Sequence, residues 1–441
     1  MQSGDKEVSA LQAVLKALAP LNRTIVSDDM DRAADLLDEA VGFPAARYQY
    51  PSGAEYGSWV VPPSWNVREA FLSDGEKVIA SYQDHALFLA PYSPPFEGWV
   101  SREDLLEHTF VSEVLDDAFA YQHRIAADYQ KRLKRWEISL PRGVISKLLK
   151  NRYFVKIDVD VRPGTMNVLE YTVKGAGDKT VGLLTHLCHP GQVNDGLSGV
   201  LAGIALLRRL AAGNSRFTYK LLVMPETFGS VIHVIAQGLS ARQFCCAAFL
   251  ETMACGERLY LKRSRTGNRP IDLAVESLAR ERPEIGVHNF FEGYGNDELI
   301  FDFANVGIPA ISVQYYPFVE YHTSRDNLEI FDWEKWTRAV DLTWELFRRL
   351  EADRIIQLKY PGPPYLTRYR LYADAVTERA RWRQISDLLA LCDGQHSILQ
   401  MCAKSGLPFH DVSDFFGLLD REGLLLKEPH IDHGSQSAGG L

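Results

Sequence analysis

Hydrophobic and polar residues alternate with different periods along this chain, and each period predicts a different kind of structure. Apolar residues such as Leu11 and Leu18 recur at helical spacing over residues 6–40. From about 56 to 110 the pattern breaks into short apolar, Pro- and aromatic-rich segments separated by turn residues, which predicts a small β module. Residues 112–135 return to a helical, charged pattern. We therefore expect helices on both sides of a small β module.

A second pair of strands is predicted just before the middle of the chain. The runs RYFVKIDVDV (152–161) and TMNVLEYTV (165–173) flank the turn residues Arg162-Pro-Gly-Thr. Two strand-like runs joined by a short turn that contains glycine are typical of a β-hairpin. We expect these two runs to pair with each other.

From residue 180 onward, buried strands alternate with helices. TVGLLTH (180–186) reads as a strand, and SGVLAGIALLRRLAAG (198–213) reads as the helix that follows it. TYKLLVMPE, CCAAFLE and IPAISVQYY continue the series of strands, and residues 333–352 form an amphipathic helix. This alternation predicts an α/β fold, with helices covering both faces of one sheet.

The shifts in pattern also predict the domain organisation. After PGPPY (361–365), which reads as a linker, HSILQMCAKSGLPFHDVSDFFGLLDREGLLL has the helix-turn-helix rhythm of a winged-helix domain, with Gly406 in the turn. We expect residues 1–55 as the helical start of the main domain, 56–115 as an inserted β domain, 116–365 as the main α/β domain, 376–430 as the winged-helix domain and 431–441 as a disordered tail.

Composition and charge narrow the classes of function. The net charge of −9 over 441 residues argues against a general polyanion binder. Within 376–430, six Lys/Arg stand against eight Asp/Glu, so we expect no nucleic-acid partner and interpret this unit as a packing or oligomerisation element, which makes a homo-oligomer plausible. The first residues, MQSGDKEVSA, do not have the basic and then apolar pattern of a signal peptide, so we expect none. No run of 18 apolar residues occurs, and the six cysteines lack the spacing of a disulfide framework. We expect a cytoplasmic protein with no membrane segment.

Metal-binding residue types recur where the predicted strands end. Because ligands of α/β sheets gather at the carboxyl ends of strands, these side chains are expected to converge on one cleft. Imidazole and carboxylate together suit zinc, and a carboxylate between two ions suits a two-metal hydrolytic site. Singly, each residue has a structural alternative; Asp195 or Asn194, for example, would cap the helix that begins near Ser198. The five residues are His186, Asp195, Glu226, Glu251 and His322.

Four segments carry a resemblance to the zinc-dependent, co-catalytic aminopeptidases of the bacterial leucyl aminopeptidase type. They are NDGLSG (194–199), PETFGS (225–230), NDELIFDFANVGIPA (296–310) and YHTSRDN (321–327). The whole chain also resembles a narrower group of bacterial proteins with an aminopeptidase-like domain, through WVVPPSWNVREA (59–70), Tyr92-Ser-Pro-Pro and T-H-L-C-H-P. The resemblance implies a helix-covered mixed sheet of zinc-aminopeptidase type, with an inserted small β domain and a C-terminal winged-helix domain.

The resemblance also implies roles for the site residues. His186 would bind one zinc ion with Glu251, Asp195 would bridge two ions, and His322 would hold the second. The family pattern has two adjacent glutamates, one a general base and one a ligand, but Pro225 replaces the first here, so Glu226 is either base or ligand.

Further departures from the family pattern leave the number of zinc ions at one or two. Cys188 stands where an aspartate would orient His186. His189 is an extra ligand, a support for one, or a structural histidine before Pro190. Asp297 either positions a site residue or caps a helix. Glu292 and Glu298 are candidates for binding the substrate amine.

The implied function is a zinc-dependent hydrolase, an aminopeptidase-like enzyme that cleaves an amide bond of a small peptide or peptide-like metabolite. Two alternatives remain open on the same scaffold. One is a glutaminyl cyclase or another amidohydrolase that uses the same metal site. The other is a non-catalytic binding protein, which the intact set of ligand residues argues against.

Overall fold

The strands between residues 165 and 316 assemble, with one N-terminal strand, into a single eight-stranded mixed sheet. The computed structural model describes residues 3–122 and 134–426. β11, β12, β13 and β16 pair in parallel, whereas β1 and β10 at one edge and β14 against β16 pair antiparallel. In spatial order the strands are β1 (Ala46–Pro51), β10 (Thr165–Val173), β12 (Thr218–Met224), β11 (Thr180–His186), β13 (Phe244–Leu250), β16 (Ala310–Tyr316), β14 (Arg258–Lys262) and β15 (Gly286–His288).

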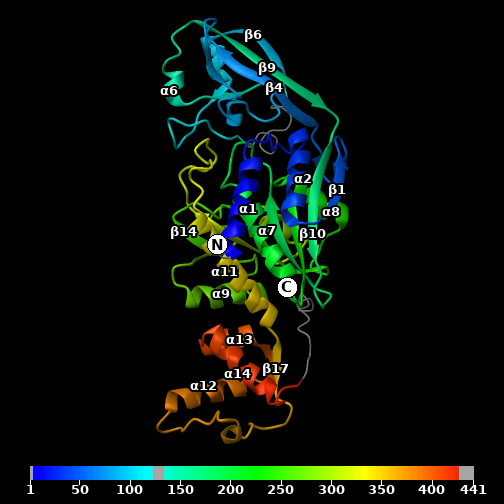
Figure 1. The fold of residues 1–441 in the computed structure, drawn as a ribbon, viewed down its shortest axis with the longest axis vertical. Helices are drawn as coiled ribbons and strands as arrows, with labels where there is room; N and C mark the ends of the chain where they lie inside the picture. The colour runs from blue at the N-terminus through cyan, green and yellow to red at the C-terminus, as the bar shows by residue number, and fades with distance from the viewer. Residues whose placement is uncertain (1–2, 123–133, 427–441) are drawn as a thin grey trace.

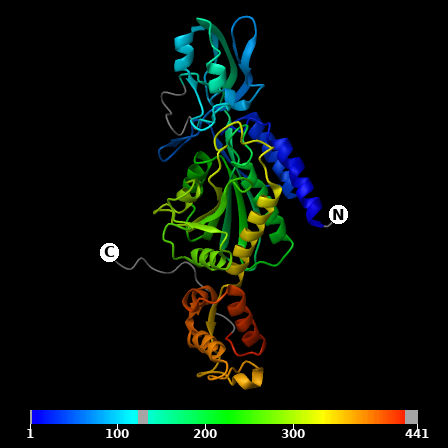
Figure 2. The ribbon, with the colours of Figure 1, turned by 90° about the vertical axis from the view of Figure 1, so that its left-hand side faces the viewer.

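This sheet is buried on both faces, which confirms the predicted α/β class. Successive residues of one strand enter different cores: Leu183 of β11 faces one, and Leu184 faces the other. Five helices pack in the first core, and two shorter helices lie towards the second (Figures 1 and 2). They are α1 (Ser3–Leu18), α2 (Asp28–Val41), α7 (Leu197–Ala211), α9 (Pro270–Glu281) and α11 (Trp333–Ala352), and then α8 (Phe228–Gln237) and α10 (Glu298–Phe301).

A separate accessory β module stands at one end of the molecule (Figure 1). Its four-stranded sheet has the order β5 (Val78–Ser81), β4 (Ser64–Ser73), β9 (Arg152–Arg162) and β6 (Phe96–Ser101). Around this sheet lie β2 (Glu55–Tyr56), β3 (Trp59–Val60), η1 (Ala86–Phe88), α3 (Arg102–Glu107), β7 (Thr109–Phe110), β8 (Ile138–Ser139) and α6 (Arg142–Ile145).

The accessory module corrects two predictions. β9 pairs with β4 and β6, whereas β10 pairs with β1 and β12, so residues 152–173 are not a hairpin; the chain crosses between sheets at Gly164. The predicted 56–115 boundary therefore excludes a strand that belongs to the module, and the range 116–365 includes it. Residues 112–122 contain no helix, and the rest of that helical prediction partly lies outside the described residues.

The C-terminal module begins earlier than the sequence predicted. β17 (Ile355–Gln357) pairs antiparallel with β18 (Asp393–Ser397), so the module already includes residue 355. PGPPY (361–365) therefore lies inside the module, and the predicted start at residue 376 is too late. Gly406 ends α13 at a φ of 71°, in the expected turn. The predicted tail, 431–441, lies outside the described residues. The remaining elements are η2 (Leu366–Tyr369), α12 (Arg379–Ala390), α13 (Ile398–Ser405) and α14 (Phe409–Arg421).

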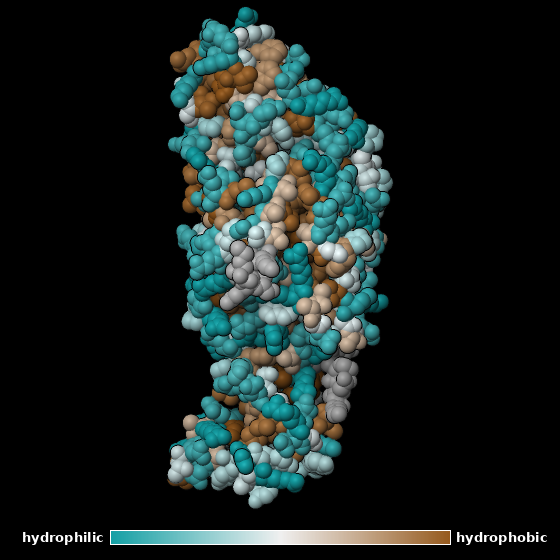
Figure 3. Space-filling view, in the orientation of Figure 1, coloured by the Kyte–Doolittle hydropathy of each residue, from teal (hydrophilic) through white to brown (hydrophobic). Residues whose placement is uncertain are grey.

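The buried apolar residues form three cores: one on the first face of the main sheet, one that is continuous between its second face and the accessory module, and one in the C-terminal module. Hydrophilic side chains cover most of the face in Figure 3. None of the helices within residues 3–122 and 134–426 is long and apolar enough to cross a membrane.

Helix α7 comes close to the strand ends because Gly199 lacks a side chain. A Cβ at Gly199 would lie 1.9 Å from the carbonyl oxygen of Leu250, whereas one at Gly213 would meet no atom closer than 3.9 Å. We predict that Gly199→Ala lowers the free energy of unfolding by about 2 kcal/mol or more, because backbone must move. The matched control Gly213→Ala should change it by less than about 0.5 kcal/mol. Urea denaturation of both variants measures the difference, and equal effects would contradict this packing.

Candidate metal centre

The sheet brings the five predicted strand-end residues to one edge. His186 is the last residue of β11, Glu226 follows β12 after Pro225, and Glu251 directly follows β13. Asp195 lies in the loop before α7, and His322 lies six residues beyond β16. Because β11, β12, β13 and β16 are parallel, their carboxyl ends share one edge of the sheet.

The first ligand group consists of His186, Asp195 and Glu251. One ligand atom of each lies within 4.8 Å of the others. His186 Nε2 is 3.3 Å from Asp195 Oδ1, and all three residues are buried. One imidazole with two carboxylates is a ligand set that zinc accepts.

The second ligand group consists of His189, Asp195 and His322, again within 4.8 Å of one another. Asp195 Oδ2 lies 3.2 Å from His322 Nε2 and 3.8 Å from His189 Nε2. The two oxygens of Asp195 thus face different groups, as a carboxylate that bridges two ions would. The His322 side chain is 31% exposed, so this group forms the open side of the centre.

The buried polar atoms of the first group fit a bound cation. Among the described residues, neither ring nitrogen of His186 has a hydrogen-bond partner of normal geometry. Buried polar atoms are nearly always satisfied, so a buried histidine whose ring nitrogens make no well-formed hydrogen bond fits a further partner such as a cation. Burial and the neighbouring Glu298 raise the pKa of Glu251 well above its usual value. A divalent cation would offset this crowding of buried carboxylates.

Glu226 lies beside the second group and belongs to neither. Its Oε2 is 3.5 Å from His189 Nε2, and its side chain is 13% exposed. Its backbone N–H donates to Cys188 Sγ at 2.9 Å. The structure thus places Glu226 next to the ligands with a carboxylate that neither ligand group includes.

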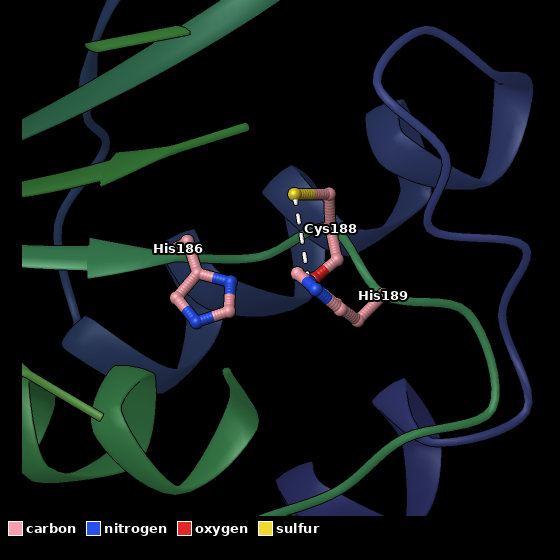
Figure 4. Close-up of side chains that lie close together, drawn as sticks. All are labelled: His186, Cys188 and His189. Carbon is pink, nitrogen blue, oxygen red and sulfur yellow. Dashed lines mark hydrogen bonds between the residues drawn. The ribbon is translucent and has the colours of Figure 1, made fainter. Parts of the chain in front are cut away.

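Cys188 lies between His186 and His189 in the sequence and forms a third candidate ligand group with them. In Figure 4 His186 stands at the end of β11, Cys188 and His189 lie in the loop that follows, and the Cys188 sulfur lies 3.8 Å from His189 Nδ1. Burial raises the pKa of the Cys188 thiol, although His186 beside it acts in the opposite direction. The thiol therefore lies beside both His186 and His189.

Backbone strain concentrates at this centre. Four of the six non-glycine residues with positive φ in the described chain are site residues or directly follow one: His189 (112°), Thr227 (61°), Thr252 (44°) and His322 (57°). Such conformations cost about 1–3 kcal/mol each and persist only where the surroundings hold them.

Buried hydrogen bonds hold the loops that carry the ligands. The Asp326 carboxylate accepts from the backbone N–H groups of Val193, Asn194 and Asp195 at 2.6–3.2 Å. Asn194 caps nothing: its Oδ1 accepts from Ala254 and Cys255, and Gly196 is the residue at the N-terminus of α7. The helix-cap alternative for Asp195 and Asn194 is therefore wrong.

The segment 294–298 supports both glutamates. Asn296 Nδ2 donates to Glu251 at 3.0 Å, and Asp297 accepts from Thr227 N and Ser230 Oγ at 2.9 and 2.8 Å. Asp297 makes no capping bond to α10, so it supports the turn after Glu226 instead. Burial raises its pKa to about 7.

The two candidates for binding a substrate amine are engaged elsewhere. Glu298 is fully buried and pairs with Lys262, which is also fully buried. Glu292 accepts hydrogen bonds from Asn289 at an exposed turn. The prediction is wrong for Glu298, because a sequence does not show that this carboxylate already has a buried cationic partner.

Several residues at the centre escaped the sequence analysis. Tyr121 packs against the rings of His189 and His322, at centroid distances of 4.6 and 5.0 Å. It is placed there because its backbone N–H donates to His322 O at 2.8 Å. The position of Asp326 in the YHTSRDN motif could have pointed to it. Tyr121 lies outside every motif, so the sequence around it does not indicate that it reaches the centre.

Removal of the Asp195 carboxylate, which both ligand groups share, should weaken zinc binding at both. We predict that purified protein holds about two zinc ions per chain and that Asp195→Ala holds far fewer, since a bridging carboxylate is a ligand of both ions. Elemental analysis of unchelated protein measures this. Asp272→Ala, at another fully buried aspartate outside the centre, is the control and should keep the wild-type content. Equal zinc content in wild type and Asp195→Ala would contradict the assignment.

Comparison with known proteins agrees with this geometry. A protein of Clostridium acetobutylicum, provisionally named a polysaccharide biosynthesis protein with an aminopeptidase-like domain, is 25% identical over 434 residues, 96% of this chain and 98% of the other. A crystal structure from the same organism, provisionally described as a peptidase, covers 96% of both chains with a TM-score of 0.84 and 23% identity. A zinc aminopeptidase from Bacillus subtilis covers 78% of this chain and 94% of its own, with a TM-score of 0.55 and 13% identity.

These likenesses confirm the predicted zinc-aminopeptidase type of fold. Residues 355–427 match a winged helix-turn-helix family, which confirms the predicted winged-helix module. Residues 12–353 match the family described as Domain of unknown function (DUF4910). Because this match spans most of the chain, the protein belongs to the DUF4910 family.

Proposed function

We propose that this protein is a zinc-dependent hydrolase that cleaves an amide bond of a small peptide or peptide-like metabolite. The observation that carries the proposal is Asp195, which belongs to two ligand groups and directs one oxygen towards each. A carboxylate shared in this way is characteristic of two-metal hydrolytic centres.

The residues divide into two ion sites. His186 and Glu251 would hold one ion, His189 and His322 would hold the other, and Asp195 would lie between them. Bound zinc lowers the pKa of water and polarises a carbonyl group. In this arrangement His189 supplies the ligand that a glutamate provides in the family pattern.

In this arrangement Glu226 would act as the general base. Its carboxylate lies beside the second group without belonging to it. From there it would take the proton of the attacking water and deliver it to the nitrogen of the leaving amine. Cys188, which accepts from the Glu226 N–H, and Asp297, which holds the following Thr227, would keep the base in place.

The substrate would enter from the side of His322, because this is the exposed part of the centre while the first group is fully buried. Aromatic rings border that side: Tyr321 stacks on His322 at 3.9 Å, and Tyr294 stacks on Tyr321 at 4.2 Å. Such a border suits a small substrate with an apolar or ring-bearing group. The name of the Clostridium relative adds sugar-linked amides to the substrates that deserve testing.

The winged-helix module would serve packing and not nucleic-acid binding. Exposed Asp411 and Asp414 on α14 would repel phosphates. The module instead contacts the main domain, where Arg280 donates to Cys402 O and Phe409 N donates to Glu281. We also propose a cytoplasmic location and self-association through its exposed surfaces.

The base assignment predicts that metal binding and turnover can be separated. Glu226→Gln should retain both zinc ions but lose about 10²–10⁴-fold in kcat on a panel of aminoacyl p-nitroanilides, because an amide cannot take a proton. His189→Ala should instead lose one ion. Zinc content and kcat are measured on the same preparations.

The converse result would reverse the two roles. If Glu226→Gln loses an ion while His189→Ala keeps both, Glu226 is the ligand. If the wild type holds zinc but hydrolyses no amide in the panel, the proposed activity is wrong.

A further inference from the structure

The two ion sites are built differently, and the second depends on an unusual loop. In the first, His186 and Glu251 lie at the ends of buried parallel strands. In the second, His189 lies in the irregular loop between β11 and α7. Its φ is 112°, and Pro190 follows it in the sequence. A non-glycine residue in that region is strained, so something must hold the loop.

Arg23, in the turn between α1 and α2, forms hydrogen bonds with this loop. Its side chain is fully buried. Nη1 donates to Leu187 O at 2.8 Å and Nη2 donates to Gln192 O at 2.5 Å, so one guanidinium spans the two ends of the segment that contains His189. The backbone carbonyl of Arg23 accepts from the N–H of His189 itself at 3.2 Å.

Burying a guanidinium is costly. Arg23 forms no ion pair among the described residues, although the charges of Asp326 and Asp195 nearby favour its charged form. Burial lowers its pKa only to about 10, so the guanidinium stays charged. Its planar fork fits two carbonyl oxygens at once, which a lysine ammonium does less well. Loop geometry, not ion pairing, therefore accounts for the residue.

We propose that Arg23 is a positioning residue that builds the second ion site by fixing His189 in its strained conformation. The inference rests on the proposed function, because it assumes that His189 is a ligand. It gives the N-terminal segment a role in the metal centre. Residues that orient a ligand typically change metal affinity by about 10–100-fold when they are removed.

The test compares zinc affinities of full-length variants by competition with a chromophoric chelator. In Arg23→Met the second, weaker zinc ion should bind about 10–100-fold less tightly, while the first should change by less than about threefold. Arg23→Lys keeps the charge but not the fork, so we expect an intermediate loss at the second ion and native stability. If Arg23→Met does not fold, Arg23→Lys decides the matter alone.

A matched control separates positioning from general stability. Arg349 on α11 is also buried and pairs with Glu281 of α9 at 2.7 Å and with Glu345 of α11 at 2.9 Å, outside the candidate centre. Arg349→Met should lower thermal stability yet bind both ions as the wild type does.

Each outcome has one meaning. If wild type binds two ions and Arg23→Met and Arg23→Lys bind both equally tightly, the role of Arg23 is refuted and the proposed function stands. If both affinities fall together, Arg23 is a structural residue only. If wild type binds no second ion, the proposed two-ion function fails, and this inference fails with it.

Discussion

The buried carboxylate of Asp195 organises the functional half of this molecule. Three imidazoles surround it, from His186, His189 and His322, and they hold its pKa well below the usual value although burial opposes this. The three imidazoles must stay close to the Asp195 carboxylate, since an unpaired buried charge is costly. The three backbone N–H groups given to Asp326 fix the loop on which Asp195 stands.

The residues around Asp195 are held with unequal rigidity by the rest of the fold. Parallel strands position His186 and Glu251 through a continuous ladder of backbone hydrogen bonds. His189 and His322 lie in strained turns, and segments outside the sheet hold them: Arg23 for one and Tyr121 for the other. The N-terminal helices and the accessory module therefore contribute to the metal centre as well as to the cores.

Much of this could be predicted from the sequence, for identifiable reasons. Strands such as TVGLLTH are continuous apolar runs that end in a metal-competent residue, so both the strand and the position of its ligand are local signals. The partner of a strand is not a local property, which is why β9 and β10 looked like a hairpin although they join different sheets. Arg23 and Tyr121 reach the centre only through tertiary packing. That His189 and not Glu226 joins Asp195 and His322 in one group is visible only from distances.

The most direct test of the account is the position of bound zinc in crystals of the full-length protein. Anomalous diffraction at the zinc absorption edge should show two peaks with Asp195 between them. His186 and Glu251 should contact one peak, and His189 and His322 the other, with Glu226 contacting neither ion directly. A single peak away from Asp195, or a second ion bound by Glu226 with His189 turned aside, would contradict the account.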